Sequence, residues 1–223
     1  MTPRKPVVLF GTGRLARTIL YFLVHESPYE IAAVTVDREH MKGDETFGLP
    51  TIPFETLSET HPPDAYDLFL ALGYRRMNRL REERFRQAKE MGYQLVSHIS
   101  PRASTWPNLE IGENCLVLDE VVVHPYVTIG DDTIIWSGSH VGHGTAIGDH
   151  CFIASRAAIS GWVTVANNCF LGTNCTVRDG LSLAPMSLVG AGVVVTRDTT
   201  EGQILAPPEP RILPGRSDRL PRF

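Results

Sequence analysis

Residues 129–165 read IGDDTIIWSGSHVGHGTAIGDHCFIASRAAISGWVTV, and every sixth residue from Ile129 is aliphatic. The column continues in both directions without exception. Its members are Ile111, Val117, Val123, Ile129, Ile135, Val141, Ile147, Ile153, Ile159, Val165, Leu171, Val177, Leu183, Val189 and Val195. A strand repeats every two residues and a helix about every 3.6, so a period of six indicates short flat sides with a corner after each. The pattern predicts a parallel β-helix.

A second column, two residues before the first, holds mostly small or β-branched side chains. Its members are Leu109, Cys115, Val121, Val127, Thr133, Ser139, Thr145, Cys151, Ala157, Val163, Cys169, Cys175, Leu181, Ser187 and Val193. All four cysteines of the chain belong to this column, and they lack the Cys-x-x-Cys spacing of a zinc site. We therefore expect the cysteines to pack in the interior and to carry no redox or metal chemistry.

The composition of the chain limits the kinds of molecule that it is expected to bind. The chain has 223 residues, a formal net charge of -4 and a pI near 6.1, so no basic field would recruit nucleic acid or an anionic membrane. It contains no apolar run of about twenty residues, and its first ten residues lead directly into a strand without a secretory segment. We expect a cytoplasmic protein that acts on small molecules.

The pattern breaks near residue 100, which predicts an N-terminal domain over residues 1–100, the coil over 101–200 and a tail over 201–223. Strands and helices alternate in the first domain, which indicates a small Rossmann-like parallel sheet. The expected elements are strands at Lys5–Phe10, Ile31–Val36, Tyr66–Leu72 and Tyr93–Ser97, with helices from the glycine turn to about Val24 and from about Arg75 to Met91.

The segment from Gly11 to Ala16 matches the G-x-G-x-x-G/A fingerprint of dinucleotide sites, and Asp37 ends the next strand, where an acid would accept a ribose hydroxyl. Alone, this pattern suggests NAD. Glycines and a helix N-terminus can hold any nucleotide diphosphate, however, and about four strands are too few for a full dinucleotide fold. We favour a sugar nucleotide over NAD, and a purely structural tight turn remains an alternative.

Six arginines interleave with glutamates between residues 75 and 90, which predicts a solvated helix face with ion pairs one turn apart. Arg75 and Arg76 follow the third strand, at the carboxyl edge where open α/β sheets bind ligands. Of the six arginines, we therefore consider only these two as candidates to bind a phosphate group.

The hexapeptide pattern resembles that of the hexapeptide acyltransferases. This resemblance implies a left-handed parallel β-helix with three six-residue sides, about eighteen residues per coil. One coil beyond His143 is then Gly161, and coils lie about 4.8 Å apart. A surface imidazole below a glycine N–H pairs a general base with an oxyanion donor, as acyl transfer needs. His124, His140 and His150 have no such partner, and we expect them to be surface or accessory residues.

A narrower resemblance rests on three features together. They are the N-terminal glycine loop, the segments Ala71-Leu72-Gly73 and His98-Ile99-Ser100-Pro101, and the stretch from Gly142 to Gly148. The chain resembles the bacterial sugar acetyltransferases, which include nucleotide-sugar N-acetyltransferases of glycan synthesis and sialic acid O-acetyltransferases. The likeness covers about residues 5 to 200.

This resemblance implies a homotrimer with sites between subunits, acetyl-CoA as cosubstrate and no metal. It implies His143 as general base and Gly161 as amide donor to the thioester carbonyl. The remaining implied contacts are Gly161, Gly172, Thr173, Gly190 and Ala191 for acetyl-CoA, and Gly11, Gly13, Asp37 and Gly73 for the nucleotide sugar. The chain departs from its relatives in having Gly144 where many carry Glu, a glycine loop one residue shorter, and no Gly-x-Pro-Ala strand after Gln203.

The sequence therefore predicts an acetyl-CoA-dependent N-acetyltransferase acting on a nucleotide-linked deoxyamino sugar. O-acetylation of a sugar or sialic acid hydroxyl is the nearest alternative. A β-helix lyase of the carbonic anhydrase type, with a metal on His124, His140 and His143, is an alternative from another class. A non-catalytic scaffold is a third.

Overall fold

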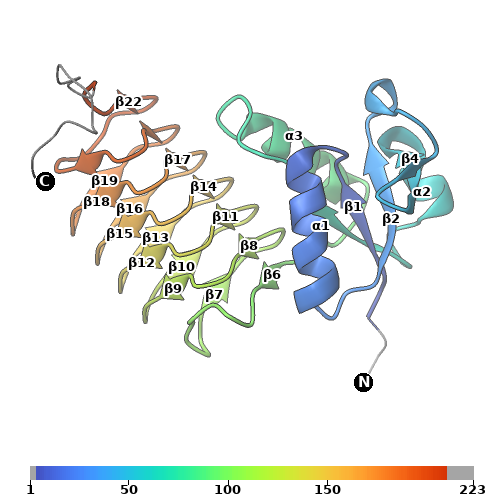
Figure 1. Ribbon diagram of the computed structural model, residues 1–223, viewed down its shortest axis with the longest axis horizontal. Helices are drawn as coiled ribbons and strands as arrows, with labels where there is room; N and C mark the ends of the chain where they lie inside the picture. The colour runs from blue at the N-terminus through green and yellow to red at the C-terminus, as the bar shows by residue number, and fades with distance from the viewer. Residues whose placement is uncertain (1–3, 210–223) are drawn as a thin grey trace, which may run out of the picture.

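The aliphatic column lies inside a parallel β-helix in the computed structural model, which describes residues 4–209 (Figure 1). Each strand pairs in parallel with the strand one coil later, as Thr128 with Ala146 and Ile129 with Ile147. Stacked corner residues are 18 positions apart, as the resemblance implied. The predicted fold class, a small Rossmann-like α/β domain followed by a parallel β-helix of hexapeptide repeats, is confirmed.

The coil has three faces, each a parallel sheet named here by a central strand. The β10 sheet holds β7 (Glu110–Ile111), β10 (Thr128–Ile129), β13 (Ala146–Ile147), β16 (Thr164–Val165) and β19 (Ser182–Leu183). The β11 sheet holds β6 (His98–Ile99), β8 (Leu116–Val117), β11 (Ile134–Ile135), β14 (Phe152–Ile153), β17 (Phe170–Leu171), β20 (Leu188–Val189) and β22 (Ile204–Leu205). The β12 sheet holds β9 (Val122–Val123), β12 (His140–Val141), β15 (Ala158–Ile159), β18 (Thr176–Val177) and β21 (Val194–Val195).

Part of the segment predicted as a tail belongs to the coil. Ile204 and Leu205 form β22, which pairs with β20, and Pro207 approaches Gly190 closely. Residues 210–223 of that predicted tail lie outside the described residues.

The N-terminal domain is a five-stranded sheet in the order β3-β4-β2-β1-β5. Its neighbouring strands are parallel except β3 and β4, which are antiparallel. Its elements are β1 (Val7–Phe10), α1 (Arg14–Glu26), β2 (Ile31–Val36), η1 (Arg38–His40), β3 (Glu45–Thr46), β4 (Leu49–Pro53), η2 (Phe54–Thr56), α2 (Leu57–Thr60), β5 (Asp67–Leu70) and α3 (Arg79–Glu90). No helix within residues 4–209 is both long and apolar enough to cross a membrane.

Three local predictions for this domain differ from the structure. The expected strand over residues 93–97 is wrong: only Leu95 bridges to β5, because the chain then leaves the sheet and pairs with β8 of the coil. The helix expected from Arg75 begins at Arg79, since residues 76–78 all have positive φ. The β3–β4 hairpin was not predicted. It turns at Phe47 and Gly48, both with positive φ, and lacks the usual Asn-Gly or Asp-Gly signal.

The four cysteines pack in the coil interior, as predicted. Cys115, Cys151, Cys169 and Cys175 are free thiols, each 0% exposed. Burial raises the pKa of Cys115 and of Cys175 to about 12, because a thiolate would lose its hydration there. These thiols stay protonated and act as small apolar side chains.

The N-terminal domain packs against the β8, β11 and β14 part of the β11 sheet, and the coil extends beyond it to β22 (Figure 1). Outward-facing side chains of this sheet, among them Leu116, Ile134 and Phe152, join α1 residues Ile19 and Leu23 in one buried cluster. The corresponding positions of the other two sheets are mostly polar or small. The first domain therefore has a single apolar face on which to dock.

A buried polar network joins the two domains beside this apolar contact. Arg81 of α3 is 0% exposed, and its Nε donates to Asp132 Oδ1 of the coil at 2.9 Å. Its Nη2 donates to the Cys151 carbonyl at 3.0 Å, and its Nη1 to the Gly73 carbonyl at 3.3 Å. His150 Nδ1 lies 2.8 Å from the other Asp132 oxygen. The expectation of a solvated α3 face is therefore wrong at Arg81, and His150 is buried rather than at the surface.

Arg81→Ala should reduce the free energy of unfolding by about 3–5 kcal/mol, because it leaves the Asp132 carboxylate buried without its charged partner. Arg86→Ala is the matched control on the same helix. The Arg86 side chain is 65% exposed and, among residues 4–209, pairs only with Glu82 one turn away, so it should contribute about 0–1 kcal/mol. Urea denaturation of both variants measures the difference. Equal losses would contradict the role assigned to Arg81.

Candidate functional site

The glycine loop lines a cavity of about 390 Å³ at the carboxyl ends of β1, β2 and β5. All four residues predicted to hold the nucleotide sugar line it: Gly11, Gly13, Asp37 and Gly73. Gly11 has φ of 128°, and a Cβ there would lie 3.0 Å from the Ala71 carbonyl oxygen, so only glycine fits. Gly13 caps α1, whose first turn has no side-chain cap and no acidic residue. This leaves the N–H groups of the helix free for an anion in the cavity.

The acid predicted to bind ribose is paired within the chain. Asp37 Oδ2 accepts a 2.8 Å hydrogen bond from Arg84 Nη2, and both side chains are largely buried. Arg75 and Arg84 line the same cavity, so it offers positive charge beside the helix N-terminus. Arg76 does not take part, because its guanidinium pairs with Glu83. The arrangement can hold a phosphate group and a polar sugar ring.

His143 lies at the corner between β12 and β13, and Gly161 lies one coil above it. A Cβ on Gly161 would be 2.8 Å from both Cε1 and Nε2 of His143, so the predicted stacking is confirmed. Across residues 4–209 the Gly161 N–H has no acceptor. The corner therefore holds an exposed imidazole beside an unpaired amide donor. Their roles as base and oxyanion donor stay predictions.

Trp162 occupies the space above Gly144. A Cβ on Gly144 would lie 2.4 Å from Trp162 Cε3, and Gly144 has φ of 66°. The Trp162 ring stands nearly perpendicular to the His143 ring, at 88°, with centroids 5.9 Å apart. A side chain at position 144, such as the Glu of many relatives, could not enter without displacing this indole.

His124 and His140 form a pair beside His143, so the three histidines grouped in the metal-site alternative do lie close together. Their ring centroids lie 4.7 Å apart, and His124 is 6.4 Å from His143. Burial, and then the charge of His124, lowers the pKa of His140. No group of three His, Cys, Asp or Glu within residues 4–209 is placed to hold a metal ion, and these three histidines form no such group.

Of the five residues predicted to contact acetyl-CoA, Gly161 lies beside His143, and the other four cluster at another corner, between the β11 and β12 sheets. A Cβ on Gly172 would lie 2.6 Å from the Ala191 nitrogen, so Gly172 and Thr173 stack below Gly190 and Ala191. Thr173 and Ala191 are exposed. The structure brings these four residues together but does not bring them to His143. Both groups flank the β12 sheet, at its opposite edges.

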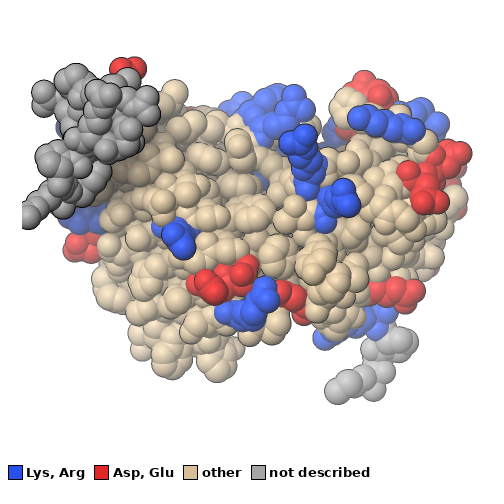
Figure 2. Space-filling model, viewed as in Figure 1, with Lys and Arg blue, Asp and Glu red and all other residues tan. Residues whose placement is uncertain are grey.

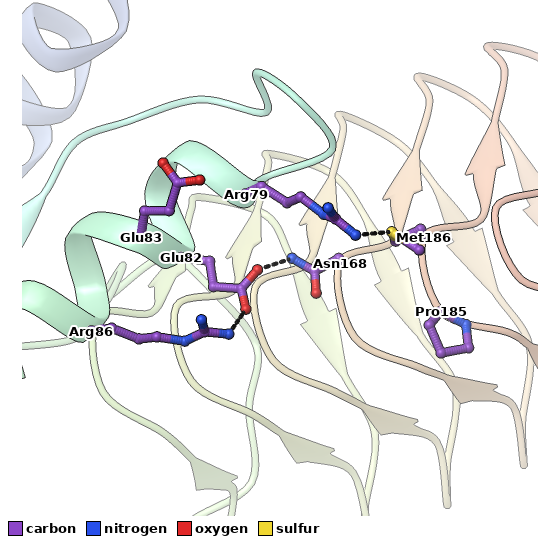
Figure 3. A pocket seen from close by; sticks show the side chains of 7 residues that line it. All are labelled: Arg79, Glu82, Glu83, Arg86, Asn168, Pro185 and Met186. Atoms are coloured by element: carbon purple, nitrogen blue, oxygen red, sulfur yellow. Dashed lines mark hydrogen bonds and ion pairs between the residues drawn. The ribbon is translucent and has the colours of Figure 1, made fainter.

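A second cavity, of about 370 Å³, lies between α3 and the coil corner at Pro185 and Met186 (Figure 3). Within its lining Glu82 binds both Arg86 and Asn168, and Glu83 pairs with Arg76 outside it. Arg79 points at the Met186 sulfur. None of the predicted site residues lines this cavity. We assign it to the domain contact rather than to the chemistry.

Within one chain the glycine-loop cavity and His143 lie on opposite sides of the coil. The first domain packs against the β11 sheet, and α3 reaches the corner that carries Asp132, between the β10 and β11 sheets. His143 occupies the corner between the β12 and β10 sheets. In a three-sided coil, that corner is opposite the β11 sheet.

Two family models match the repeat region. Residues 108–143, 126–161 and 144–179 match the bacterial transferase hexapeptide (six repeats), and residues 163–197 match the hexapeptide repeat of succinyl-transferase. Over residues 108–197 the chain is similar to the hexapeptide transferases. The acetyl-CoA-dependent acyltransferase class predicted from the sequence is confirmed. No curated protein sequence matches the chain.

Solved structures extend the likeness across both domains. Perosamine N-acetyltransferase from Caulobacter crescentus, as a histidine-to-asparagine mutant with CoA and GDP-perosamine, is 28% identical with a TM-score of 0.81, covering 91% of this chain and 93% of that one. PerB from the same organism, also with CoA and GDP-perosamine, is 29% identical with a TM-score of 0.78, over 91% and 94%. The acetyltransferase domain of PglB from Neisseria gonorrhoeae, at 22% identity, a TM-score of 0.77 and coverage of 90% and 96%, supports the fold. The resemblance to sugar acetyltransferases with a left-handed β-helix is thereby confirmed.

Sequence reasoning missed two contacts at the candidate site. Trp162 could have been found by adding one coil to Gly144, the same step that linked His143 with Gly161. The bond between Arg84 and Asp37 joins residues 47 positions apart, and only the placement of α3 over the sheet reveals it.

Gly161→Val should lower kcat by about 10²–10³-fold while costing about 1–2 kcal/mol of stability. The added side chain would begin 2.8 Å from the His143 ring and would cover the free Gly161 N–H. Steady-state kinetics and thermal unfolding of the same preparation separate the two effects. Unchanged turnover would show that Gly161 is only a corner glycine.

Proposed function

We propose that this chain transfers the acetyl group of acetyl-CoA to an amino group of a nucleotide-linked deoxyamino sugar in bacterial glycan biosynthesis. The observation that carries the proposal is the combination of the His143–Gly161 pair with the glycine-loop cavity on a separate domain. The likeness to an enzyme solved with CoA and GDP-perosamine supports both substrate classes. The cytoplasmic location expected from the sequence stays a prediction.

The proposed chemistry needs one base and one oxyanion donor. The amine attacks the thioester carbonyl carbon and loses a proton to the His143 ring, while the Gly161 N–H stabilises the oxyanion. Collapse breaks the C–S bond, and the CoA thiolate takes up the proton. An amine is already a good nucleophile, so positioning and general-base help of about 10²–10⁴-fold are sufficient without a covalent intermediate.

The opposite placement of the two sites supports an active site shared between two copies of the chain. A sugar held in the cavity of one chain cannot reach His143 of that chain across the coil, so the amine would meet His143 of a neighbouring subunit. The outer faces of the β10 and β12 sheets suit such packing, because they carry small residues such as Ala146, Ala158 and Thr176. The coil surface seen in Figure 2 has few charges. We therefore propose a homotrimer with sites between subunits.

Acetylation of a hydroxyl uses the same residues and remains the second candidate. A hydroxyl depends more strongly on its base than an amine does, and a base needs an orienting group. Position 144 provides no hydrogen-bonding side chain for that purpose, which favours the amine.

His143→Ala should lower kcat by at least about 10²-fold without changing the oligomer or CoA binding, because it removes only the base. The assay is thiol release from acetyl-CoA across UDP-, dTDP- and GDP-linked amino sugars. His25→Ala, at the exposed C-terminal end of α1, is the matched control. Near-normal turnover in the His143 variant would remove this residue from the mechanism. Thiol release with hydroxyl sugars alone would favour the second candidate.

Mixed oligomers test whether the site is shared between subunits. Gly13→Leu should block the cavity without strain, because a Cβ at Gly13 meets nothing within 4 Å. Gly13→Leu and His143→Ala should each be inactive alone. Co-expression should restore part of the activity, since some sites then combine an intact cavity from one subunit with an intact His143 from the other. An inactive mixture of correctly assembled oligomers would place both groups in one chain.

A further inference from the structure

The His143 ring has no hydrogen bond to any other group in residues 4–209, although it lies at an exposed corner. A general base that takes a proton in the transition state needs a fixed orientation, which a third group normally supplies. Gly144 has no side chain to do this. Something else must restrict rotation of the imidazole.

Trp162 is the side chain placed to do so. Its backbone N–H donates to the His143 carbonyl at 2.8 Å, so the two residues are joined across neighbouring coils. Its ring stands at 88° to the imidazole, in the edge-to-face arrangement that aromatic pairs favour. Trp162 has φ of 57° and is 63% exposed. Positive φ recurs at this corner position, as at Tyr126, so the feature that distinguishes Trp162 is an exposed indole packed edge-to-face against the His143 ring.

Gly144 and Trp162 fit each other. A Cβ at position 144 would lie 2.4 Å from the indole carbon Cε3 of Trp162. The indole can take this position only because residue 144 is glycine. Residue 144 has no side chain, and Trp162, one coil later, fills the space that such a side chain would need. The two features therefore depend on each other.

We propose that Trp162 is the positioning residue for His143. The indole forms a wall that holds the imidazole ring against Gly161 and leaves its open edge to the acceptor. The inference rests on the proposed function for its catalytic consequence, whereas the orientation of the ring can be measured without turnover.

Trp162→Asn tests the proposal in the full-length protein, because Asn tolerates the left-handed conformation. We expect kcat to fall about 10- to 100-fold with the KM for acetyl-CoA nearly unchanged, the signature of a misoriented base. Trp162→Phe should recover most of the loss. Tyr126→Asn is the matched control. Tyr126 lies two coils below at the same corner position, with φ of 63° and 76% exposure, and its ring is not paired with His143 in the described residues.

NMR of histidine-labelled protein gives the independent readout, with His143→Asn to assign the resonance. Three-bond couplings should show one His143 χ1 rotamer in the parent protein and rotamer averaging in Trp162→Asn. Averaging in a protein that acetylates no amino sugar would support the role of Trp162 and reject the proposed function. Unchanged kcat and a single rotamer in Trp162→Asn, with a parent protein that acetylates, would overturn the role of Trp162 and keep the function.

A second variant tests whether a Glu at position 144 can replace Trp162 in orienting His143. Gly144→Glu alone should impair turnover, because the added side chain meets the indole. In the Trp162→Asn background the same Glu has room and can accept a hydrogen bond from the His143 ring, so kcat should rise above that of Trp162→Asn alone. Equal effects of Gly144→Glu in both backgrounds would contradict the exchange.

Discussion

The stacking register of the coil determines which side chains meet at its surface, because each corner residue lies over the residue one coil earlier. At the corner between the β10 and β11 sheets, this register closes each turn with a side chain from the coil above. The amides of Glu113, Asp131 and Asp149 donate to the side-chain oxygens of Asp131, Asp149 and Asn167. His143 occupies the equivalent turn position at another corner, but the residue above it is Gly161. The absence of one side chain leaves this corner open.

The same register explains why the first domain docks on only one side. A strand exposes one of its two residues, so each face of the coil has its own outward column. On the β11 sheet that column is apolar, and it buries Leu116, Ile134 and Phe152 against α1. Arg81 then fixes the domain, since it binds Asp132 of the coil and the carbonyl of Gly73 in the cavity wall. The position of the glycine loop therefore depends on a buried ion pair in the contact between domains.

Much of this architecture could be predicted from the sequence, because the hexapeptide period is a local signal repeated many times. The coil and the buried cysteines follow from counting residues, and the stacking of Gly161 over His143 follows from the eighteen-residue coil that the resemblance implies. The first domain was predicted less accurately, since its hairpin turns at Phe47 and Gly48 without a common turn signal. Arg81 was misassigned for another reason. The residue pattern of the helix shows that Arg81 is charged. It does not show that this side chain will be buried against a carboxylate of the coil.

The buried thiols have a practical consequence for measuring this protein. All four lie within the coil and none is exposed, so thiol reagents added to the folded protein would react with released CoA and not with the enzyme. Unfolding the coil would expose the four sulfur atoms, at a spacing set by the same repeat that buries them. The cysteines thus form an internal probe that is silent in the native state and reports loss of the coil independently of the N-terminal domain, which contains no cysteine.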